Sequence, residues 1–103
     1  LWISDQKGKK LFVFDISKRP PEPKGHVDLS MGGHGWVTFS LDGKYAYCHT
    51  PDIFDASSKE KVASFKGPNG EPFASSKFIE VHMRGTKVVR IGNEFGLGRV
   101  HSR

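Results

Sequence analysis

The sequence has a single cysteine, few apolar residues and no apolar run long enough to span a bilayer. With no second cysteine, Cys48 cannot form an intrachain disulfide or a multi-cysteine metal site, so we expect it to be a small buried thiol. The residues A, V, I, L, M, F, W, Y and C make up 36% of the chain, which is low for a self-sufficient core. No signal peptide is visible. No segment sustains the 3.6-residue period of a helix, and the sequence therefore predicts an all-β fold.

The charge balance is basic, with 16 Lys and Arg against 11 Asp and Glu. Basic chains can bind nucleic acid or acidic surfaces, but here most cations are dispersed, which favours a solvated surface. A nucleic-acid function would have only the charge of the C-terminal region to support it, from Arg84, Lys87, Arg90, Arg99 and Arg103. We therefore expect neither a nucleic-acid partner nor a membrane span.

Short apolar or alternating runs recur between turn residues, as expected for strands. Asp42-Gly43 supplies the positive-φ position of a tight turn between two of them, and Arg84-Gly85 is the predicted turn of a final hairpin. The predicted strands are Leu1–Ser4, Leu11–Phe14, His26–Leu29, Trp36–Ser40, Tyr45–His49, Ile53–Phe54, Val62–Phe65, Phe78–Met83 and Lys87–Ile91. A Pro-rich loop is expected over residues 18–24.

The chain also repeats itself. "VFDIS" at residues 13–17 returns as "IFDAS" at residues 53–57, an offset of 40 residues between Asp15 and Asp55. A period of about 40 residues with four short strands fits one blade of a β-propeller. Each Asp ends a strand, where its carboxylate can accept backbone N–H bonds of the following turn, so a structural role is expected for both.

This period predicts about two and a half four-stranded antiparallel blades. Residues 1–30 would supply the last three strands of one blade and residues 34–67 a complete blade. Residues 68–76 would form a linker, and residues 77–103 a terminal hairpin and tail, half of a further blade. Because blades bury their faces against neighbouring blades, this segment would leave apolar faces and strand edges open.

The stretch "GHGWVTFSLDGKYAY" resembles the strand-turn-strand motif of bacterial YVTN-type β-propeller repeat proteins, and the chain is similar to their C-terminal blades. "LWISDQKGKKLFVFDIS" resembles the paired strands of the same repeat, and "GNEFGLGRV" is similar to a closing segment of bacterial members. The resemblance implies a periplasmic or secreted protein. The start at Leu1, inside a predicted strand and without Met, suggests a longer polypeptide whose remainder, or other chains, would complete the ring.

The function expected from the resemblance is a non-catalytic propeller segment that acts as a binding or assembly scaffold. The alternative is a portion of a channel-site enzyme, either a lactonase-like hydrolase or a redox protein with haem or metal. Propellers host many unrelated activities, so fold does not choose between the two. No cofactor is identified and no catalytic residue is predicted.

The candidate ligand-binding residues are His34 and Trp36. His34 precedes the innermost strand of its predicted blade, which would place it near the central channel; the opposing interpretation is a turn histidine that packs beside Trp36. One histidine cannot make a metal site, and His26, His49, His82 and His101 show no metal-ligand spacing. "GNEFGLG" opens no helix and lacks the dinucleotide-binding order of glycines, so it is interpreted as a loop. The aromatic residues Trp2, Trp36, Phe39, Tyr45 and Tyr47 are expected to pack between sheets.

Overall fold

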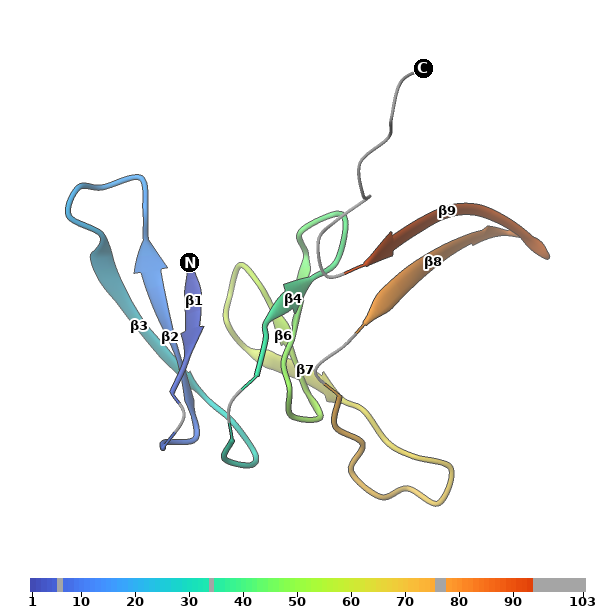
Figure 1. The fold of residues 1–103 in the computed structure, drawn as a ribbon, viewed down its shortest axis with the longest axis horizontal. Helices are drawn as coiled ribbons and strands as arrows, with labels where there is room; N and C mark the ends of the chain where they lie inside the picture. The colour runs from blue at the N-terminus through green and yellow to red at the C-terminus, as the bar shows by residue number, and fades with distance from the viewer. Residues whose placement is uncertain (6, 34, 76–77, 94–103) are drawn as a thin grey trace.

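A computed structural model describes residues 1–5, 7–33, 35–75 and 78–93 of the chain. Within these residues the fold is all-β, with no helix and three antiparallel sheets, so the predicted fold class is confirmed at that level. The sheets follow one another in chain order, with the first sheet beside the central sheet and the final hairpin beyond it (Figure 1). No helix in the described part of the chain could cross a membrane.

The first sheet contains β1 (Trp2–Ser4), β2 (Lys10–Asp15) and β3 (Glu22–Asp28), in that order. β3 begins at Glu22, inside the segment that the sequence predicts as a loop. Pro23 pairs with Phe14 in the ladder. Because β3 is an edge strand of its sheet, it accommodates a residue that lacks a backbone N–H.

The central sheet contains four strands in chain order: β4 (Thr38–Phe39), β5 (Tyr45–Tyr47), β6 (Asp52–Asp55) and β7 (Lys61–Ser64). β4 and β5 are shorter than predicted. Trp36 precedes β4, and Cys48 and His49 follow β5, so these three residues lie outside the ladder.

The turn between β4 and β5 is held by side chains of the Ser-x-Asp-Gly-Lys motif. The Ser40 hydroxyl donates to Asp42 Oδ1 at 2.7 Å and accepts the Tyr45 N–H at 3.0 Å. Asp42 Oδ1 also accepts the Lys44 N–H at 3.0 Å. Gly43 has φ 73°, in the left-handed region that glycine adopts without strain. The predicted turn at Asp42-Gly43 is confirmed, and the side chains of the motif stabilise it by hydrogen bonds.

The two repeated aspartates perform the same local task in successive sheets. Asp15 Oδ1 accepts the hydroxyl and the backbone N–H of Ser17, and these bonds lower the pKa of that carboxyl. Asp55 Oδ1 accepts the N–H groups of Ser58 and Ser57 at 2.8 and 2.9 Å, which lowers its pKa likewise. The predicted structural role of both residues is confirmed.

The final hairpin consists of β8 (Ile79–Arg84) and β9 (Lys87–Asn93). Arg84 pairs with Lys87, so the turn residues are Gly85 and Thr86, one position later than predicted. Gly85 has φ 61°, which explains why the turn centres after Arg84.

The apolar core lies between the first sheet and the central sheet. Its buried cluster consists of Leu11, Val27 and Leu29 from the first sheet and Ala46, Cys48 and Phe54 from the central region. The Trp2 ring meets the Phe39 ring edge-on, with centroids 5.8 Å apart. Cys48 is fully buried, as its isolation in the sequence predicts.

A buried carboxylate joins the same two sheets. Asp52 of β6 is fully buried, and its Oδ2 accepts the Ser30 N–H at 2.8 Å and the Ser30 hydroxyl at 2.9 Å. The Thr50 hydroxyl donates to the same oxygen at 2.7 Å, and Lys61 Nζ lies 2.6 Å from Oδ1. Burial by itself would raise the pKa of Asp52, but the Lys61 ammonium and the Ser30 and Thr50 donors outweigh it and lower the pKa.

Candidate functional site

Of the two residues predicted to bind a ligand, the structure describes only Trp36. His34 lies outside the described residues. Trp36 is 52% exposed and borders a cavity of about 350 Å³ between the first sheet and the segment that leads into β4. The cavity is lined by Trp2, Ile3, Ser4, Gly35, Trp36 and Val37.

The glycines of this lead segment allow a close approach to His49. A Cβ atom on Gly35 would overlap the His49 side chain, and one on Gly33 would stand 3.7 Å from its ring. The Ser4 hydroxyl donates to the Gly35 carbonyl at 3.1 Å and ties the lead to β1. The lead is therefore positioned from both sides, by Ser4 and by His49.

The cavity beside Trp36 suits contact with an apolar or aromatic group. None of the described lining residues titrates near neutral pH, and the Ser4 hydroxyl is engaged with a backbone carbonyl. The exposed indole of Trp36 supplies apolar contact area. The described lining offers apolar and aromatic contact area for binding.

A second cavity, of about 170 Å³, lies between the central sheet and the hairpin. Its described wall holds four aromatic rings, from Phe39, Tyr47, Phe65 and Phe78. Phe78 stacks on Tyr47 and on Phe65, with ring centroids 5.6 Å apart in both pairs. Burial raises the pKa of Tyr47, and the Glu80 carboxylate adds to that effect. The described residues of its lining are Thr38, Phe39, Leu41, Tyr47, Phe65, Phe78, Ile79 and Glu80.

Glu80 connects the hairpin to the central sheet at this cavity. Its Oε2 accepts the Leu41 N–H at 2.9 Å, and its Oε1 lies 2.5 Å from His82 Nε2. A Cβ on Gly92 would meet the Leu41 side chain at 2.8 Å, so β9 packs closely on the same turn. Both carboxylate oxygens have structural partners, which favours an anchoring role over a catalytic one.

The described residues form neither a metal site nor a reactive cysteine site. They contain no group of three or more His, Cys, Asp or Glu side chains that could hold a metal ion. Burial raises the pKa of the Cys48 thiol to about 12, and Asp52 contributes, so the thiol is protonated at neutral pH and inert. His26 lies on β3 and His82 on β8, in different sheets. His101 and the glycine-rich "GNEFGLG" stretch, apart from its first two residues, lie outside the described part of the chain.

One sequence interpretation of individual residues needs correction. Trp36 and Tyr45 were expected to pack between sheets, yet they are 52% and 40% exposed. Phe39 is 41% exposed but contacts Trp2 of the first sheet edge-on. Asp52, Phe78 and Glu80 were not singled out from the sequence. A Thr-x-Asp pattern at residues 50–52 is a weak local signal for a hydrogen-bonded carboxylate, whereas Glu80 had no signal because its partner is 39 residues away.

Comparison of the chain with protein-family models, with curated proteins and with solved structures gave no match. The resemblance to YVTN-type repeats therefore stays a prediction from the sequence.

Proposed function

We propose that the chain is a non-catalytic segment of a YVTN-type β-propeller that acts as a binding or assembly scaffold within a longer periplasmic or secreted protein. The observation that carries this proposal is the repetition of one unit. β2 and β6 are each the next-to-last strand of successive antiparallel meanders, and each ends in an Asp whose Oδ1 accepts the backbone N–H of the serine two residues later. Propeller blades are repeated antiparallel meanders of this kind.

The exposed apolar side chains support a role inside a larger assembly. Seven hydrophobic residues are buried among those described, whereas sixteen large hydrophobic residues are exposed. Ile3 and Phe12 are an exposed cross-strand pair on the face of the first sheet away from the core, and Leu1 and Ile16, which flank β1 and β2, are exposed as well. Contiguous exposed apolar surface marks an interaction site, and stacked blades bury such faces against one another.

The proposal predicts that the native polypeptide, or its stable complex, is larger than 11.5 kDa. Intact mass measurement of the protein from its native source tests the first possibility. Sedimentation of the isolated chain tests the second, with association or aggregation expected. A soluble monomer with a cooperative melt would contradict the proposal.

A second candidate is part of a channel-site enzyme, as a lactonase-like hydrolase or a haem or metal redox protein. The cavity beside Trp36 is the observation that favours it. Haem and metal analysis of the native protein, together with the activity of a Trp36→Ala variant, separates it from the scaffold. Bound metal or haem, or activity lost on this substitution, would support the enzyme.

A further inference from the structure

A β-bulge determines which face of the final hairpin each side chain occupies. Lys87 and Arg90 are three residues apart, which in a regular strand would place them on opposite faces. The register shifts between His82 and Met83, so Arg84 pairs with Lys87 and His82 pairs with Arg90. Since directly opposed residues share a face, all four side chains belong to one side of the hairpin.

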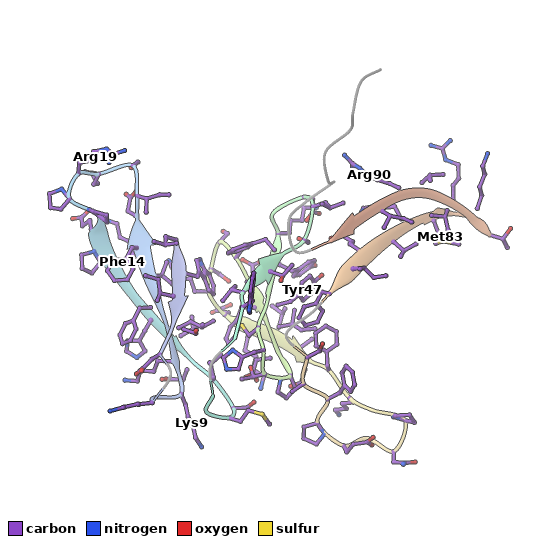
Figure 2. All side chains as sticks on the ribbon, viewed as in Figure 1. Lys9, Phe14, Arg19, Tyr47, Met83 and Arg90 are labelled. Atoms are coloured by element: carbon purple, nitrogen blue, oxygen red, sulfur yellow. The ribbon has the colours of Figure 1, made fainter. Side chains whose placement is uncertain are left out.

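The other side of the hairpin is apolar. Val81 pairs with Ile91 and Met83 pairs with Val88, and Ile79 continues the same row. These five side chains are between 43% and 71% exposed. Met83 and Arg90 both lie on the hairpin away from Tyr47 of the central sheet (Figure 2). The hairpin thus exposes an apolar face and a cationic face.

Only the base of the cationic face is engaged with the rest of the described chain. Glu80 and Gly92 form one cross-strand pair there, and both contact Leu41 in the turn between β4 and β5. Glu80 is the one acidic residue on this face and is paired with His82. Arg84, Lys87 and Arg90 lie between this contact with Leu41 and the turn of the hairpin, and their side chains are exposed.

The free edge of the hairpin is the second element of the surface. In the first and central sheets each new strand adds beside its predecessor, so spatial order equals chain order. By the same rule a further strand adds beside β9, whose outer N–H and C=O groups have no ladder partner among the described residues. Lys87 and Arg90 are on β9 and would adjoin that strand directly.

From this geometry we propose that β9 binds an extended strand in which acidic and apolar residues alternate. Its acidic side chains would lie beside Lys87 and Arg90, and its apolar side chains would extend the face of Val81, Met83 and Ile91. Main-chain hydrogen bonds supply affinity, and the alternate side chains supply selectivity. The inference rests on the proposed function in one respect, because it specifies the strand that completes the third sheet.

Charge and edge pairing favour an acidic strand over a second copy of this chain or an anionic lipid surface. Edge-to-edge pairing of two copies through β9 would bring Lys87 and Arg90 of both copies onto one sheet, and like charges in neighbouring positions are destabilising. An anionic lipid surface would engage the cations and the apolar face, but would leave the backbone groups of the β9 edge unpaired. An acidic strand satisfies the edge, the cations and the apolar face together.

The test uses the full chain and two capped ten-residue peptides, labelled with fluorescein, that alternate Val with Glu or Val with Lys. Anisotropy titrations should give an affinity about tenfold higher for the Glu peptide, because cross-strand charge pairs favour it. In the Lys87→Glu/Arg90→Glu variant the preference should invert toward the Lys peptide. The matched control is Lys7→Glu/Lys9→Glu, which changes net charge equally in an exposed turn of the first sheet and should leave the preference unchanged.

Amide hydrogen exchange should show new protection in β9 when the Glu peptide binds. Equal affinity for the two peptides, or a response to Lys7→Glu/Lys9→Glu as large as that to the β9 variant, would overturn the inference. Binding to phosphatidylserine vesicles or to an oligonucleotide that the Glu peptide does not compete away would overturn it too. Peptide binding by a chain that proves to be a stable monomer would refute only the proposed function, and an assembled chain that binds neither peptide would refute only this inference.

Discussion

Ser30 donates both its backbone N–H and its hydroxyl to one oxygen of Asp52, at 2.8 and 2.9 Å. Ser30 follows the last strand of the first sheet, and Asp52 begins β6 of the central sheet. A single buried carboxylate therefore links the first sheet and the central sheet beside their shared apolar core. The Lys61 ammonium, 2.6 Å from the other oxygen, supplies the compensating charge.

Replacement of Asp52 should weaken the contact between the sheets. Asp52→Ala leaves the Ser30 N–H and the Thr50 hydroxyl without their acceptor and deprives Lys61 of its partner, and such losses cost about 3 kcal/mol in the free energy of unfolding. Urea unfolding followed by tryptophan fluorescence measures the change. Asp28→Asn is the matched control, because Asp28 is exposed, and it should change stability by less than about 0.5 kcal/mol.

The same carboxylate should make stability depend on acid. The pKa of Asp52 is lowered from the ordinary value of 3.8 in the folded chain. Its stabilisation is therefore fully present above pH 3.8 and is lost as the pH falls through the lower folded-state pKa. Urea midpoints measured from pH 6 downward should decline below about pH 4. The decline should be shallower in Asp52→Asn, and an identical decline in both proteins would assign the acid sensitivity to other carboxylates.

Cys48 should resist thiol reagents while the chain is folded. The thiol is fully buried and its pKa is raised to about 12, so both access and thiolate are lacking at pH 8. Reaction with 5,5′-dithiobis(2-nitrobenzoate) should be slow in buffer, where the chain is folded, and fast and complete in denaturing urea. Rapid reaction of the native chain would show that the contact between the two sheets opens readily.

Gly35 should tolerate no side chain. The added methyl group of Gly35→Ala would overlap His49, so the lead segment must move, at a cost of about 1–3 kcal/mol. We expect a lower urea midpoint together with a change in Trp36 emission, since Trp36 is the next residue. Gly32→Ala is the control, because its nearest neighbour would be Lys9 Cγ at 3.8 Å, an ordinary contact. Equal effects of the two substitutions would mean that backbone freedom, and not the approach to His49, requires glycine at residue 35.

The sequence by itself determined the features that depend on neighbouring residues. Alternating side chains predict strands, and Asp42-Gly43 predicts its turn because Gly43 adopts positive φ without strain. Asp15 and Asp55 were assigned structural roles correctly because their partners are two or three residues away. Such contacts recur wherever the local pattern recurs, so a repeat in the sequence becomes a repeat in the structure.

Tertiary structure alone decided the features that join distant segments. Asp52 meets Ser30 across 22 residues, and Glu80 meets Leu41 across 39, and no local pattern encodes either distance. The placement of Lys87 and Arg90 on one face follows from a bulge opposite His82 and Met83. In a β-sheet a shift of one residue moves every later side chain to the opposite face, so a register that is set by pairing also sets which residues can act together.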